Sequence, residues 1–170
     1  MGLNEAALSL TLGIAAWTDW HERRIYNKLL GPSFLAALTI HFYQSGFNGL
    51  RVSLIGALIG FLLLLIPYFL GGIGAGDVKL LAVIGAFGTA QFVVTSFLYG
   101  AIIGGCISAA YLIRRKALIA TLKNYFLFLP YISAKSLSEN VKLAQQEKFP
   151  YGIAIVLGTI IAFYVPLGVW

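Results

Sequence analysis

The chain has 170 residues, of which 59% are hydrophobic and only 11% are charged. Soluble domains carry about 25% charged residues, so this composition excludes an ordinary soluble protein and indicates an integral membrane protein. Each crossing of a hydrocarbon core about 30 Å thick takes roughly 20 apolar residues, so membrane spans use up most of the chain. The sequence therefore predicts one integral membrane domain over residues 1–170, with the lipid bilayer as its surroundings.

Six apolar segments can be distinguished along the chain. In chain order they cover about residues 3–18, 30–45, 52–70, 78–90, 92–112 and 150–168. The first segment has Glu5 rather than basic residues near its start and is followed by basic residues, which is typical of a retained helix rather than of a secretory signal peptide. We expect an all-α polytopic membrane protein with about six transmembrane helices and its N-terminus outside.

The basic residues agree with this orientation. With the N-terminus outside, the connections 19–29, 71–77 and 113–149 fall in the cytoplasm, and the lysines and arginines lie in or beside them except for Arg51. Membrane insertion thus explains the net charge of +6, and nucleic acid is not expected as a partner. The long connection 113–149 carries the apolar patch "YFLFLPYISA" and is expected to lie in the cytoplasm or at the membrane interface.

Several kinds of catalytic site are excluded by the residues that the chain lacks. Cys106 is the single cysteine, so an intrachain disulfide and a cysteine-rich zinc site cannot form. The expected topology puts His21 and His41 on opposite sides of the membrane, which leaves no Cys/His or Ser/His/Asp arrangement. We expect no metal and no cofactor.

Two of the six acidic residues stand at span ends that the topology places at one membrane boundary. Asp19 ends the first span in "AAWTDWHERRIYN", and Asp77 opens the fourth in "GAGDVKLLAV". Taken singly, Asp77 could be a helix N-cap and Asp19 could pair with Arg23 or Arg24 in a solvated loop. Taken together, the two carboxylates could share a proton and act as base and acid on a peptide bond, which is the chemistry of an aspartic peptidase.

The glycines before Asp77 fit a site that admits a peptide backbone. Gly71, Gly72, Gly74 and Gly76 permit an irregular loop at membrane depth, and such a loop is tolerated where it lines a cavity. The alternative is a flexible turn between two spans, which glycine pairs often form.

The stretch "GAGDVKLL", residues 74–81, resembles the second-aspartate motif of the type IV prepilin peptidases, membrane aspartic peptidases of the GxGD class. The matching residues are Gly74, Gly76, Asp77, Lys79 and Leu80. A first-aspartate motif is similar in Asp19, Arg24, Ile25, Tyr26 and Asn27, with Tyr26 where the family commonly has proline. The stretch "KFPYGIAIVLG", residues 148–158, resembles the opening of the family's last span through Pro150, Tyr151 and Gly152.

This resemblance implies an aspartic endopeptidase of the bacterial inner membrane, with Asp19 and Asp77 as its catalytic residues at the cytoplasmic face. Its substrates would be prepilins or pseudopilins, which lose a short basic leader. Residues expected to support the substrate or the aspartates are Gly74, Gly76, Lys79, Arg24, Asn27, Pro150, Tyr151 and Gly152. Larger family members carry an N-terminal cytoplasmic domain associated with N-methylation. This chain begins with its first span, so it resembles the short form that serves Tad/Flp pilus systems, and we expect cleavage without methylation.

Two other functions are compatible with the same residues. A small proton- or ion-coupled transporter could use Asp77 as its protonatable site, although the spans offer few polar partners along a path. A non-catalytic membrane scaffold of a pilus or secretion complex could retain the motifs as structure. The sequence predicts neither the oligomeric state nor whether the two aspartates meet in the resting protein.

Overall fold

The computed structural model describes residues 2–70, 72–114 and 151–165, with side chains described for all of these except 108–114. This part of the chain forms five helices and no strand, which confirms the all-α class. The helices are α1 (Leu3–Glu22), α2 (Asn27–Phe69), α3 (Ala75–Phe87), α4 (Ala90–Arg114) and α7 (Tyr151–Tyr164). The expected connection 113–149 lies outside the described residues apart from its first two, which end α4.

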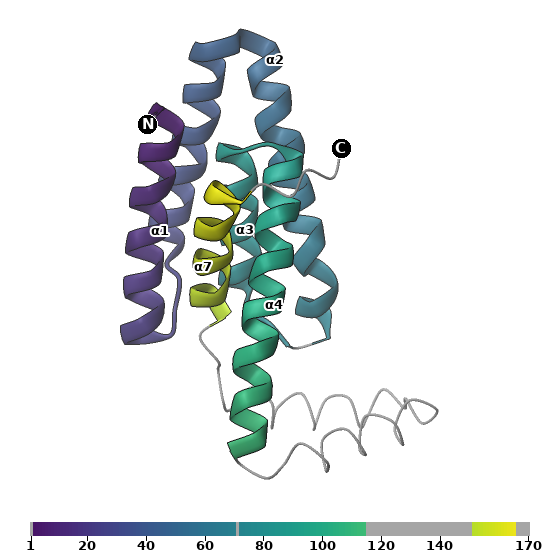
Figure 1. Ribbon diagram of the computed structural model, residues 1–170. Helices are drawn as coiled ribbons and strands as arrows, with labels where there is room; N and C mark the ends of the chain where they lie inside the picture. Colours follow the sequence, from purple (N-terminus) through teal and green to yellow (C-terminus); the bar gives the residue numbers. More distant parts are fainter. Residues whose placement is uncertain (1, 71, 115–150, 166–170) are drawn as a thin grey trace.

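Helix α2 is bent back on itself at Gly46, which has φ 58° and ψ −139°. Side chains strongly disfavour such a backbone, and glycine adopts it readily because it has no Cβ. The two legs run beside each other from this bend (Figure 1), so the predicted segments 30–45 and 52–70 both lie on α2. Helices α2 and α4, over Asn27–Phe69 and Ala90–Ile107, are long and apolar enough to cross a membrane. The number of crossings and the side of the N-terminus remain predictions.

Helix α3 is the central helix of the bundle. Nine of its thirteen residues are buried, among them Leu80, Leu81 and Ile84, which are fully enclosed. It begins at Ala75, three residues before the predicted segment 78–90, so Asp77 belongs to its first turn. At 1.5 Å per residue this helix is about 20 Å long, which is shorter than the roughly 30 Å hydrocarbon core.

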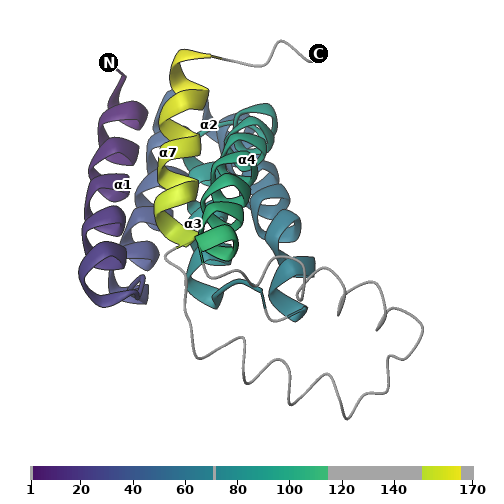
Figure 2. The same cartoon turned by 60° about the horizontal axis from the view of Figure 1, so that its bottom comes forward.

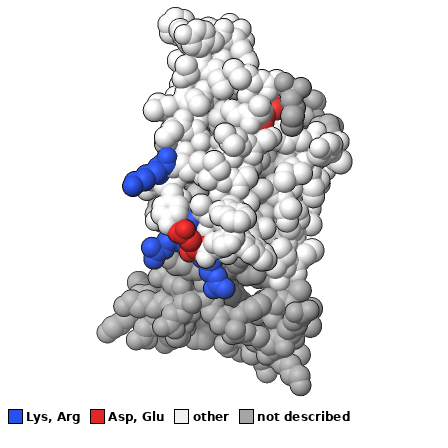
Figure 3. All heavy atoms as spheres, turned by 90° about the vertical axis from the view of Figure 1, so that its left-hand side faces the viewer, with Lys and Arg blue, Asp and Glu red and all other residues white. Residues whose placement is uncertain are grey.

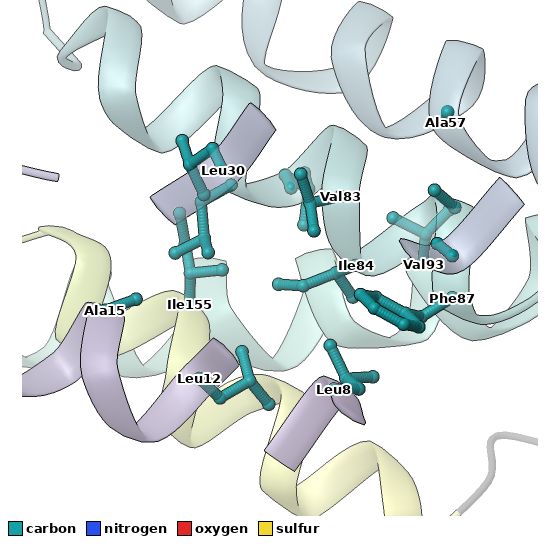
Figure 4. Close-up of a cluster of buried hydrophobic side chains, with 14 of the residues drawn as sticks. Leu8, Leu12, Ala15, Leu30, Ala57, Val83, Ile84, Phe87, Val93 and Ile155 are labelled. Atoms are coloured by element: carbon teal, nitrogen blue, oxygen red, sulfur yellow. The ribbon is translucent and has the colours of Figure 1, made fainter. Parts of the chain in front are cut away.

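A single apolar core joins α3 to the surrounding helices (Figure 4). Val83, Ile84 and Phe87 of α3 meet side chains from α1, α2, α4 and α7, including Leu8, Leu12, Leu30, Ala57, Val93 and Ile155. Close approach of backbones holds α3 against α2, because a Cβ on Gly56 would collide with the carbonyl oxygen of Gly85, and the reverse is also true. Small residues at crossings of this kind are typical of membrane helices.

The outer surface of the bundle is apolar. On α2, Leu58, Ile66 and Phe69 are 57%, 69% and 73% exposed. Trp17 and Trp20 are exposed near the end of α1, and tryptophan is enriched where helices meet the membrane interface. Such a surface suits contact with lipid, and it supports the expectation of a membrane protein.

Several helix ends meet at one end of the bundle. Figures 1 and 2 show the end of α1, both ends of α2 and the starts of α3 and α7 at the lower end of Figure 1. On the face drawn in Figure 3, most of the Lys and Arg atoms and the larger acidic patch lie in the lower half of the view, and most of the remaining described surface is uncharged. The fold therefore brings Asp19, Asp77 and the beginning of α7 to the same level.

Candidate active site

Asp19 lies in the last turn of α1 and is only 5% exposed. Its Oδ2 accepts a hydrogen bond of 3.1 Å from the backbone N–H of Ile153, in the first turn of α7. The backbone N–H of Gly152 also favours the charged form of this carboxyl. The alternative pairing of Asp19 with Arg23 or Arg24 is not found among the described residues, where both arginines are exposed.

Asp77 lies in the first turn of α3 and is 9% exposed. Its Oδ2 accepts a hydrogen bond of 3.1 Å from the backbone N–H of Gly74, which is the N-cap residue of the helix. The alternative of Asp77 as the N-cap residue is wrong, because Asp77 is residue N3 and its hydrogen bond reaches back to the N-cap in a capping box. One carboxylate oxygen makes it, so capping and a chemical role are compatible.

The charge of Asp19 acts on the ionisation of Asp77. Both residues lie at the ends of their helices, α1 and α3, outside the two helices that are long and apolar enough to cross a membrane. Burial raises the pKa of Asp77, and the nearby charge of Asp19 raises it further. Burial also raises the pKa of Asp19, against the opposing effect of the two α7 amides.

Ile25, in the connection between α1 and α2, lies between the start of α3 and the start of α7. Its Cβ is 3.1 Å from the position that a Cβ on Gly76 would occupy. Its Cδ1 is 3.0 Å from the corresponding position on Gly152. Both glycines therefore leave room for Ile25, which packs the α1–α2 connection between α3 and α7.

The carboxylate of Asp19 also requires glycine at position 152. A Cβ there would lie 2.7 Å from Oδ2 and 3.0 Å from Cγ of Asp19, which is closer than non-bonded atoms tolerate. Tyr151, the first residue of α7, is partly buried, and its ring packs beside Gly104 of α4. Pro150, the third residue predicted from this motif, lies outside the described residues.

The predicted basic residues do not contact the carboxylates. Lys79 is exposed and donates a hydrogen bond of 3.0 Å to Oδ1 of Asn27, joining α3 to the start of α2. Arg24 is exposed in the α1–α2 connection. Beside the Lys79–Asn27 contact is a cavity of about 340 Å³ whose other lining residues are Leu30, Gly31, Phe34, Ala82 and Val83. The Glu22 carboxylate accepts a hydrogen bond from the Tyr26 hydroxyl in the same region.

Sequence reasoning missed the contact between Asp19 and the amide of Ile153. A backbone donor has no residue signature, and only the motif "PYG" pointed to this part of the chain. The described residues contain no group of three or more His, Cys, Asp or Glu side chains that could hold a metal ion.

Comparison with known proteins agrees with the motifs. Residues 6–109, which include both aspartates, match the model of the type IV leader peptidase family. Over 155 residues the chain is 29% identical to the prepilin leader peptidase/N-methyltransferase of Bacillus subtilis (strain 168). That similarity covers 88% of this chain and 50% of the relative, so the chain spans about half the length of the protein it matches. No solved structure matches the chain.

Proposed function

Because the chain belongs to the type IV leader peptidase family, we propose that it is an aspartic endopeptidase that removes the short basic leader from prepilins or pseudopilins, using Asp19 and Asp77. The observation that supports this proposal is that the fold buries both motif aspartates, Asp19 in the last turn of α1 and Asp77 in the first turn of α3, at the same end of the bundle. The scissile bond would lie at the cytoplasmic face of the inner membrane, beside the end of α1 and the start of α3.

The proposed reaction needs one ionised and one protonated carboxyl group. The ionised group takes a proton from a water molecule, whose oxygen attacks the scissile carbonyl carbon. The protonated group gives its proton to the leaving nitrogen as the C–N bond breaks. Gly72 and Gly74 are exposed just before α3, and their lack of side chains would let an extended substrate backbone come close to the start of that helix.

The proposal is tested by co-expressing a tagged Flp-type prepilin with the wild-type protein and following the leader by mass spectrometry. We expect a product shortened at the leader with an unmethylated new N-terminus. A prepilin that remains uncut, at normal levels of the membrane protein, would overturn the assignment of substrate.

The same assay separates the peptidase from a non-catalytic scaffold. Asp77→Asn keeps the size and shape of the side chain but cannot cycle a proton, so cleavage should stop while the amount of protein in the membrane stays unchanged. Gly13→Ala is a matched control, because Gly13 is exposed on α1 and a Cβ there meets no atom within 4 Å. Normal cleavage by Asp77→Asn would contradict the proposed chemistry.

A further inference from the structure

The connection between α1 and α2, residues 23–26, is held by hydrogen bonds at both of its ends. The backbone N–H of Arg23, the C-cap of α1, donates a hydrogen bond of 3.0 Å to the carbonyl oxygen of Asp19. The carbonyl oxygen of Tyr26, the N-cap of α2, accepts hydrogen bonds of 3.0 Å and 3.2 Å from two N–H groups in the first turn of that helix. A short segment held at both ends has little freedom to move, so a side chain on it can act as a fixed spacer.

Ile25 of this connection faces two helix starts with different atoms. Its Cβ lies 3.1 Å from the position that a Cβ on Gly76 would take, and its carbonyl oxygen lies 3.5 Å from the same position. Its Cδ1, at the far end of the side chain, lies 3.0 Å from the corresponding position on Gly152. One isoleucine side chain therefore separates the start of α3 from the start of α7.

Each of these glycines directly precedes a residue of the candidate site. Gly76 precedes Asp77 in the first turn of α3. Gly152 precedes Ile153, whose N–H donates the hydrogen bond of 3.1 Å to Oδ2 of Asp19. A shift of either helix start relative to Ile25 would therefore move one carboxylate or the donor that holds the other.

We propose that Ile25 is a positioning residue of the candidate site, which spaces the start of α3, with Asp77, from the start of α7, which holds Asp19. The inference deepens the proposed function and rests on it for the effect on cleavage. Ile25 has no acid–base chemistry of its own and acts through the two aspartates. An apolar side chain suits this place, because it fills the space without offering Asp19 or the α7 amides a competing hydrogen-bond partner.

A polar contact beside Ile25 gives α3 a second anchor. Asn27, the first residue of α2, accepts the hydrogen bond of 3.0 Å from Nζ of Lys79. The stretch from Ile25 to Asn27 thus meets α3 at positions on either side of Asp77 in the sequence. Its contact with Gly152 of α7 is made by Cδ1 of Ile25. Shortening this side chain should therefore loosen the start of α7 more than the start of α3.

Substitutions at position 25 can separate spacing from general stability. Ile25→Val removes Cδ1, the atom that faces α7, and keeps the Cβ that faces α3, whereas Ile25→Ala removes more of the spacer. Ile84→Val is the matched control, because it deletes the same carbon from a fully buried isoleucine in the apolar core of α3. Ile25→Leu keeps the number of carbons and should restore most of what Ile25→Val loses. The valine variant changes the packing least and serves if Ile25→Ala does not fold.

The spacing can be measured without any substrate, by hydrogen exchange of the full-length protein with resolution of single amides. The Ile153 amide is in the first turn of α7, where N–H groups have no acceptor within the helix, so its protection reports the bond to Asp19. Asp19→Ala gives the exchange rate of the freed amide. We expect Ile25→Ala to speed this exchange roughly tenfold, Ile25→Val to speed it less, and Ile84→Val to leave it unchanged. Wild-type exchange of Ile153 in both Ile25 variants would overturn the inference.

Cleavage kinetics then show whether the spacing matters for the reaction. A misplacement of about 1 Å in a catalytic site can cost roughly 10²-fold in rate, so Ile25→Ala should lower kcat per folded molecule by up to about this factor, with KM nearly unchanged. A residue that only stabilises the fold would change the amount of folded protein and leave kcat alone. The rate should be close to wild type in Ile84→Val and largely restored in Ile25→Leu.

The outcomes separate this inference from the proposed function. Faster exchange of Ile153 in the Ile25 variants, together with a wild-type protein that leaves prepilin uncut, would refute the proposed substrate and keep the spacing role. Cleavage of prepilin with a wild-type kcat in both Ile25→Val and Ile25→Ala would keep the proposed function and refute the positioning role of Ile25.

Discussion

Ser53 offers a direct test of how α3 is held in the bundle. Its hydroxyl donates a buried hydrogen bond of 2.6 Å to the carbonyl oxygen of Ala86. Ala86 is in the last turn of α3, where carbonyl groups find no N–H donor within the helix. The Ser53 hydroxyl therefore supplies the Ala86 carbonyl with a hydrogen-bond donor. Hydrogen bonds between membrane helices contribute about 0.6 kcal/mol on average and up to about 1.7 kcal/mol. A buried carbonyl that loses its partner costs about 1–3 kcal/mol in all, and the two ranges overlap at about 1–2 kcal/mol. We therefore expect Ser53→Ala to lower the free energy of unfolding by about 1–2 kcal/mol.

The free energy of unfolding can be measured by titrating the purified protein from mild detergent into dodecyl sulfate and following the loss of helical and tertiary signals. Ser9→Ala is the matched control, because Ser9 is exposed on α1, and its loss should change stability by less than about 0.5 kcal/mol. Equal stability of Ser53→Ala and Ser9→Ala would refute the view that this hydrogen bond ties α3 to α2.

Two further substitutions test features far from the carboxyl groups. Gly46→Ala should destabilise the bent helix α2 by about 1–3 kcal/mol in the same titration, because its backbone conformation disfavours any side chain; a wild-type midpoint would show that the bend tolerates a Cβ. Cys106→Ser should leave the rate of leader cleavage nearly unchanged, since Cys106 is an exposed residue of α4, and a large loss of activity would reveal a role for the thiol.

The apolar segments and the positions of the carboxylates could be predicted well from the sequence. Long apolar runs leave few alternatives to helices in a membrane, and Asp19 and Asp77 stand out because charges at such positions are costly. Both residues lie at the same end of the bundle, and the expectation that this end is a membrane boundary stays a prediction. The boundaries were less accurate, since α3 begins at Ala75 and takes in Asp77, and the two segments around Gly46 form one bent helix.

Contacts made by the backbone could not be predicted. Nothing in the residue types around Ile153 indicates that its N–H reaches Asp19, because every residue except proline carries the same donor. The motif residues Lys79 and Asn27 are brought together, but with each other rather than with the carboxylates. Ile25 appeared in a motif without a role, and only the three-dimensional arrangement reveals that it fills the space between Gly76 and Gly152.

The most direct measurement of the proposed pair is the rate of leader cleavage by purified, reconstituted Asp19→Asn, Asp77→Asn and the double variant. Residues that act as a unit in catalysis are strongly non-additive, so each single substitution should lower the rate by roughly 10³-fold or more and the double variant should be no slower. Either single variant retaining about a tenth of the wild-type rate, or a double variant showing the product of two separate losses, would contradict the assignment of Asp19 and Asp77 as one catalytic pair.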